Sequence, residues 1–246
     1  MKKIKLLLAA SAVLALSASA SVKMTQADLD KTINTFPKML KNEMISVDKA
    51  VVEKNGMKHL GLIAKNPRGE QKFFEVFVFD DAKNPTMVIG RAYDKNGDVI
   101  NLPVNKKIIE SGVSLKIGTG PKQIYVVTDP ECPYSKRLYK NIKESNLKKI
   151  TINVITMPLS YHKESKPMLY WVLSAKTDKE KAKRLKAVMS KNDQTYKTFK
   201  PTKAEKELVD NMIEKSNKAA SELGAKGTPS VYDSNFKQID SSILTK

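Results

Sequence analysis

Residues 123–136 have the sequence QIYVVTDPECPYSK, in which an apolar run ends at a polar turn that contains Cys132. The run is short and rich in β-branched and aromatic residues, which predicts a buried strand over 123–128. The residues after the turn, 136–144, have a helical pattern. The sequence therefore places Cys132 between the end of a buried strand and the start of a helix.

A cysteine in this position is expected to be reactive. The N-terminal N–H groups and the dipole of a helix favour an anion, and Lys136 and Arg137 add positive charge, although Glu131 opposes it. Since the thiolate is the nucleophilic form of cysteine, we expect Cys132 to react at neutral pH. The alternative is a buried structural cysteine, the commonest fate of a free thiol. The polar turn favours the reactive interpretation.

The first twenty residues predict export. Lys2, Lys3 and Lys5 precede an apolar run over 6–16, and the stretch ends in the small residues 18–20. This is the pattern of a cleaved signal peptide, 1–20. An N-terminal membrane anchor is the alternative, but the run of 11 residues is short for a bilayer core of about 30 Å.

Composition limits the possible partners. The 246 residues suit two modest domains, and the formal charge of +18 could indicate nucleic acid, an anionic membrane or acidic client proteins. The lysines are spread along the chain and no nucleic-acid motif accompanies them. We therefore interpret them mainly as a solvated surface and expect no nucleic-acid partner.

The chain has one cysteine, so it cannot form an internal disulfide. In an exported protein a single cysteine indicates intermolecular pairing or a free reactive thiol. His59 and His162, the only histidines, lie in no ligand-like cluster, and we expect both on the surface or in loops. No metal and no cofactor are predicted.

The first part of the mature chain predicts a helix followed by an antiparallel sheet. Thr25 and Asp28 open the helix. Strand-like segments follow it at 45–52, 58–64, 73–79, 87–93 and 98–102, the last two around an Asn-Gly turn. We predict an α+β domain over 21–104, and a linker helix and hinge over 105–121, where Gly118, Gly120 and Pro121 punctuate the chain.

The remainder, 122–246, alternates between strands and helices. A second strand is expected at 150–155, and two later helices begin at the capping-box patterns of Thr177 with Glu180 and Thr202 with Glu205. A final hairpin is expected at 230–232 and 237–239. This order predicts an α/β domain with a central sheet and helices on its faces.

Three motifs carry a family resemblance: residues 124–129, the Cys132-x-x-Ser135 turn and Gly227-Thr228-Pro229. Together they resemble the DsbC/DsbG family of periplasmic disulfide isomerases. The resemblance implies a periplasmic homodimer in which 21–104 is a dimerisation domain and 122–246 has the thioredoxin fold. It also implies a cis Thr228–Pro229 bond beside the thiol. Cys132 and Ser135 would then be catalytic, and Pro133, Tyr134, Thr228 and Pro229 would bind substrate.

The sequence departs from that family in two ways. Ser135 stands where the family has a second cysteine, and the chain ends soon after Ile239, with little room for a last helix. A lone thiol can enter and leave mixed disulfides but cannot resolve them by the dithiol route. Ser135 can hydrogen-bond the thiolate, and an engineered trapping substitution would look the same.

We therefore expect a monothiol enzyme: an isomerase, or a reductase of mixed disulfides or sulfenic acids, acting on exported proteins that contain cysteine. A membrane redox partner or glutathione could release its complexes, and Pro133-Tyr134 is also the dipeptide typical of glutaredoxins. The alternative is a periplasmic chaperone or assembly factor whose thiol is dispensable.

Overall fold

The computed structural model describes residues 21–67, 71–81, 83–97 and 99–245. The chain divides into two compact units, 1–103 and 104–246. The predicted signal peptide, 1–20, lies outside the described residues. Within the described ranges, no helix combines the length and the apolar character that crossing a membrane requires.

The first unit contains a five-stranded sheet in the order β1-β2-β3-β4-β5, with every neighbouring pair antiparallel. Its elements are β1 (Val22–Lys23), α1 (Gln26–Thr35), α2 (Pro37–Leu40), β2 (Ile45–Val52), β3 (Lys58–Lys65), β4 (Gln71–Phe79) and β5 (Thr86–Ile89). Helix α1 begins where predicted, because the Thr25 side chain accepts the N–H of Asp28.

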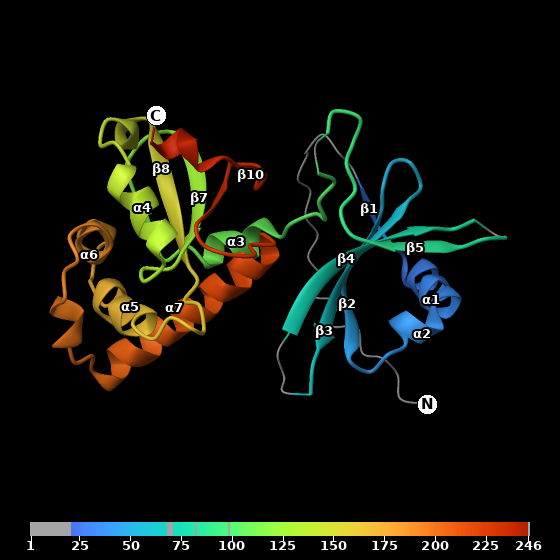
Figure 1. Cartoon of the computed structure of the whole chain (residues 1–246), viewed down its shortest axis with the longest axis horizontal. Helices are drawn as coiled ribbons and strands as arrows, with labels where there is room; N and C mark the ends of the chain where they lie inside the picture. Colours follow the sequence, from blue (N-terminus) through green and yellow to red (C-terminus); the bar gives the residue numbers. More distant parts are fainter. Residues whose placement is uncertain (1–20, 68–70, 82, 98, 246) are drawn as a thin grey trace. The chain divides into compact units, whose positions relative to one another are not determined.

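The core of this unit lies between the sheet and its two helices (Figure 1). Alternate residues of a strand point to one face. Leu60 and Leu62 of β3 and Val76 and Val78 of β4 are accordingly fully buried in one cluster with Leu29 of α1. The predicted α+β arrangement follows from this alternation.

The end of this unit differs from the prediction. Strand β5 stops at Ile89, and the expected strand over 98–102 is reduced to a single bridge between Tyr93 and Val99. Gly90 has a φ of +154°, a conformation that residues with a side chain rarely adopt. The chain therefore leaves the sheet at this glycine.

The second unit is built on a mixed five-stranded sheet in the order β10-β9-β7-β8-β6. Strands β7 and β8 are parallel, and the other pairs are antiparallel. Its elements are α3 (Lys106–Ser111), β6 (Leu115–Ile117), β7 (Lys122–Thr128), α4 (Pro133–Asn141), η1 (Asn146–Lys148), β8 (Ile150–Thr156), α5 (Ser165–Leu173), α6 (Asp178–Ser190), η2 (Thr195–Lys197), α7 (Lys203–Glu222), β9 (Ser230–Tyr232), β10 (Gln238–Ile239) and η3 (Ser241–Leu244).

Both faces of this sheet are covered, which explains the unbroken apolar run of β7. Ile124 and Val126 face a cluster with residues of α4, α5 and α6. Tyr125 and Val127 face a second cluster formed with α3 and the end of α7. Figure 1 shows the helices of this unit around β7 and β8. A strand buried on both faces is apolar throughout rather than alternating.

The segment predicted as a linker helix and hinge, 105–121, falls within the second unit. The short helix exists as α3, but Ile109 is fully buried against Ala219 of α7. Leu115 pairs with Val154 in the sheet as part of β6. Burial of these two apolar side chains draws the segment into the second unit.

Three loops of the second unit meet at one edge of its sheet. Thr128, the last residue of β7, pairs with Thr156, the last residue of β8. Ser230, the first residue of β9, pairs with Val127. The segments 129–132, 157–164 and 224–229 therefore lie together, and the first of them contains Cys132.

Candidate active site

Cys132 is the N-cap residue of α4, and Pro133 takes the first helical position. Proline suits that position because its φ is already helical and its missing N–H would have had no partner within the helix. Lys136 donates its N–H to the carbonyl of Cys132 at 2.9 Å, the first hydrogen bond of the helix. The sulfur is thus carried at the positive end of α4, where an anion is stabilised.

The Cys132 side chain contacts the predicted Thr228-Pro229 segment. Its Sγ donates to the carbonyl oxygen of Thr228 at 3.2 Å, and the Thr228–Pro229 peptide bond is cis. The residue is only 4% exposed. It is therefore more buried than its polar turn suggested, because the segment before β9 packs against it.

Two hydroxyl groups near this contact are not used by the fold. Ser135 follows Cys132 by three positions on α4 and is fully buried. Its Oγ and the Oγ1 of Thr228 have no hydrogen-bond partner among the residues that the structure describes. A buried hydroxyl without a partner costs about 1–3 kcal/mol. Each of these hydroxyl groups therefore has an unused donor.

Asp129 fixes the loop that carries Cys132. It is fully buried and accepts the N–H of Glu131 at 2.8 Å and that of Leu159 at 2.7 Å. The Ser165 hydroxyl also donates to it, and Nδ1 of His162 lies 2.8 Å from its second oxygen. One carboxylate therefore ties the loop after β7 to the loop after β8.

Glu131 makes a second link between these loops. Its Oε2 accepts the N–H groups of Glu164 and Ser165, at 2.7 and 2.9 Å, where α5 begins. A carboxylate at a helix N-terminus satisfies N–H groups that have no partner within the helix. From the sequence, the negative charge of Glu131 was expected to oppose a thiolate at Cys132. In the structure this carboxylate is bound by the N-terminal N–H groups of α5.

The predicted substrate-binding residues next to the thiol are exposed. Tyr134 is 67% exposed, and the guanidinium carbon of Arg137 lies 6.0 Å from the centre of its ring. Pro133 is also exposed. Beside the buried sulfur, the first turn of α4 therefore presents a proline, an aromatic ring and an arginine to solvent.

The expectation that both histidines lie on the surface or in loops was wrong for His59. His59 is fully buried in the first unit, with Nδ1 3.1 Å from Glu53 and Nε2 3.2 Å from Glu75. His162 lies in a loop, but its side chain is only 14% exposed and pairs with Asp129. Their carboxylate partners lie 6 to 33 residues away in the sequence, and no spacing pattern revealed these contacts. The only sequence feature that could have indicated the His162 contact was the acidic residue Asp129, three positions before Cys132.

Comparison with known proteins assigns the second unit. A family model described as a thioredoxin-like domain matches residues 113–235, half of the chain. The chain belongs to the thioredoxin-like domain family. The thioredoxin-like range includes Cys132, Ser135, Pro133 and Tyr134, together with the Thr228-Pro229 segment.

Several solved structures resemble this thioredoxin-like chain in part. The thiol-disulfide exchange protein α-DsbA2 from Wolbachia pipientis is 17% identical, with 56% of this chain and 92% of that chain covered and a TM-score of 0.40. ScsC from Proteus mirabilis in a compact conformation is 19% identical, with 56% and 73% covered and a TM-score of 0.41. A disulfide interchange protein from Neisseria gonorrhoeae is 23% identical, with 48% and 77% covered and a TM-score of 0.36. No curated protein matches the chain.

Proposed function

We propose that this protein exchanges thiols and disulfides through Cys132 alone, as an isomerase or as a reductase of mixed disulfides or sulfenic acids. The observation that carries the proposal is the position of the sulfur. It lies at the N-terminus of α4 in a thioredoxin-like domain, 3.2 Å from the Thr228 carbonyl oxygen. A helix N-terminus stabilises the thiolate that exchange requires.

In the proposed reaction the Cys132 thiolate attacks one sulfur of a client disulfide. A new bond joins Cys132 to that sulfur, and the other client sulfur leaves with the electron pair of the broken bond. A different client thiolate then attacks the client sulfur of the mixed disulfide. This step forms a rearranged client disulfide and regenerates the Cys132 thiolate.

Ser135 sets how long the mixed disulfide lasts. A serine hydroxyl does not attack a disulfide at neutral pH, so release needs an outside thiol from the client, from glutathione or from a membrane redox partner. The unpartnered Ser135 Oγ can instead donate a hydrogen bond to the attacking sulfur. We propose Pro133, Tyr134, Thr228 and Pro229 as the surface that holds the client chain.

Three proteins compared side by side test this proposal: wild type, Cys132→Ala and Ser135→Cys. Wild type should form mixed disulfides that survive on gels run without reductant, and should isomerise scrambled clients when thiol is added. Ser135→Cys should shorten the life of these complexes and start insulin-type disulfide reduction. Wild-type reduction as fast as that of Ser135→Cys would contradict the role given to Ser135.

Cys132→Ala separates the enzyme from the chaperone alternative. It should abolish complex formation and isomerase activity. The chaperone function is correct if two results are obtained together. Cys132→Ala protects unfolded clients from aggregation as well as wild type does, in cells and in vitro, and wild type forms no mixed disulfide. Identifying the proteins linked to Cys132 in cells would name the clients.

The proposal includes a homodimer formed by residues 21–104 and export to the periplasm. Strand β5 is an edge strand of the first unit, and Val88 and Ile89 on it are 46% and 59% exposed. Uncovered edges with apolar side chains favour pairing with another chain. Sedimentation of the mature protein at micromolar concentration should show a dimer, and a strict monomer would contradict this arrangement.

A further inference from the structure

The positive charge of the chain is concentrated in the unit that carries the thiol. Residues 21–103 have 13 basic and 11 acidic side chains, a net charge of +2. Residues 104–246 have 28 basic and 15 acidic side chains, a net charge of +13. Basic residues are nearly balanced by acidic ones in the first unit, whereas the second unit has about half as many acidic as basic residues. A field of this size attracts anionic partners.

Acidic side chains close to the thiol point into the protein. Asp129 is fully buried, and Glu131 is bonded to the N-terminus of α5. Burial, together with the nearby carboxylates of Glu164 and Glu131, raises the pKa of Tyr196 to about 12. Glu131 is therefore engaged by α5, and α4 itself contains no acidic residue.

The cations on α4 remain unpaired. The helix has the sequence PYSKRLYKN, with Lys136, Arg137 and Lys140 and no acidic residue. None of the three forms an ion pair with an acidic side chain in the described ranges. Arg137 contacts the ring of Tyr134, which is 67% exposed. A guanidinium against a ring still has donors free for a carboxylate.

The other two loops at this edge add to the same field. Lys163 lies in the loop after β8, next to His162, which contacts Asp129. Lys226 lies two residues before Thr228, whose carbonyl accepts the thiol. Both lysines are exposed. Helix α4 and the two other loops that meet around Cys132 therefore each carry exposed basic side chains.

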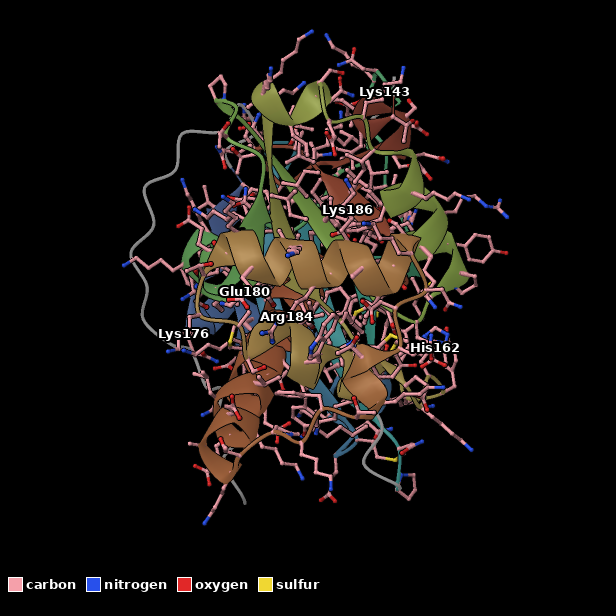
Figure 2. All side chains as sticks on the ribbon, turned by 90° about the vertical axis from the view of Figure 1, so that its left-hand side faces the viewer. Lys143, His162, Lys176, Glu180, Arg184 and Lys186 are labelled. Carbon is pink, nitrogen blue, oxygen red and sulfur yellow. The ribbon has the colours of Figure 1, made fainter. Side chains whose placement is uncertain are left out.

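Elsewhere in this unit some cations pair with acidic side chains. On α6, Arg184 pairs with Glu180 at 3.0 Å and Lys186 pairs with Glu144 at 2.8 Å; Figure 2 labels the three α6 residues along this helix. On α7, Lys218 pairs with Glu214 at 2.6 Å. Helices α6 and α7 thus carry ion pairs, whereas α4 carries none among the described residues.

We propose that the site selects client disulfides flanked by acidic side chains, with Arg137 binding a client carboxylate next to the bond under attack. This inference rests on the proposed exchange function and specifies its substrate class. Planar guanidinium and carboxylate groups can form two parallel hydrogen bonds, which position a chain as well as attract it. The proline, ring and arginine on the first turns of α4 then form one client-facing surface.

Three peptides that differ only at the residues beside their cysteine test the inference. Glutamate, glutamine or lysine flanks the cysteine, and each cysteine is a mixed disulfide with 2-thiopyridine. The Cys132 thiolate attacks the peptide sulfur, forms the new disulfide and releases pyridine thiolate with the electron pair. The leaving group is the same in all three, so the rate differences report the flanking charges.

At low salt the glutamate peptide should react about fivefold faster than the glutamine peptide, and the lysine peptide should react slowest. Salt at 0.5 M should remove most of the difference, because the Debye length falls to about 4 Å. Arg137→Gln should reduce the glutamate-to-glutamine ratio by about threefold. The control Lys148→Gln removes the same charge from η1, an exposed position before β8 at the opposite end of the sheet, and should leave the ratio unchanged.

Each remaining outcome overturns a defined part of the argument. Equal rates for the three peptides would refute acidic selection and leave the exchange function intact. If Lys148→Gln reduces the salt-dependent preference for the glutamate peptide as much as Arg137→Gln does, the role of Arg137 is refuted. The preference would then come from the net charge of the protein. No reaction of Cys132 with any peptide would refute the exchange function and this inference with it.

Discussion

Replacing Asp129 with asparagine should destabilise the thioredoxin-like unit and disturb its thiol. Asparagine has nearly the same shape, but it keeps one accepting oxygen and replaces the other with a donating NH2 group. In the structure both oxygens are in use: one accepts from Glu131 and Ser165, the other from Leu159 and faces His162. Whichever way the amide turns, a donor then faces a donor in a buried site.

The expected loss follows from these contacts. Hydrogen bonds to a charged group contribute about 1.5–3 kcal/mol each, and removal of one partner of a buried charge pair costs about 3–5 kcal/mol. Because the bonds to Asp129 share one carboxylate, they are not additive, and we expect a loss of about 3–5 kcal/mol for Asp129→Asn. This is a large part of the 5–15 kcal/mol typical of a folded domain.

Urea unfolding followed by tryptophan fluorescence measures this loss. Trp171 is the only tryptophan and lies in α5, the helix that Asp129 and Glu131 bond at its start. Asp210→Asn is the matched control, because Asp210 pairs with Lys166 across the surface and should cost less than about 1 kcal/mol. Alkylation of Cys132 should slow in Asp129→Asn because the loop loses its support. A loss below 1 kcal/mol for Asp129→Asn would refute the bracing role.

Two further predictions concern other parts of the chain. His59→Leu leaves the carboxylates of Glu53 and Glu75 without their shared partner, which should lower the stability of the first unit by about 2–4 kcal/mol. Hydrogen exchange of the amides of β3 and β4 should therefore become faster. The unfolding midpoint reported by Trp171 should stay unchanged, and unaltered exchange would contradict the prediction. Burial raises the pKa of Tyr196 and of Tyr232 from 10 to about 12, so their neutral forms stabilise the fold. That stabilisation is complete below pH 10 and is lost as the pH rises towards 12, so urea midpoints should fall over that interval, and a flat profile would exclude the effect.

Segments with strong local patterns were predicted well from the sequence. The strand at 123–128 and that at 150–155 are β7 and β8, because continuous apolar runs between two covered faces leave little choice. Helix α7 begins at Thr202 with both hydrogen bonds of the predicted capping box. The final hairpin also exists, as β9 and β10.

Features that depend on distant partners were missed. Strand β6 has three residues, too few for a pattern, and pairing with β8 creates it. The contacts of His59 involve Glu53, just after β2, and Glu75 of β4, and those of His162 involve an acid in another loop. For the candidate site, the sequence supplied Cys132 and its neighbours on α4, whereas the supporting contacts appear only when the three loops meet.

The links from Asp129 and Glu131 also limit how the chain can vary in length. Both carboxylates bind backbone N–H groups at fixed positions, Leu159, Glu164 and Ser165. One residue inserted or deleted between 159 and 164 would change the spacing between these donors, whatever the side chains. The residues 191–194 after α6 donate no hydrogen bond to either carboxylate, so a change of chain length there leaves both links in place.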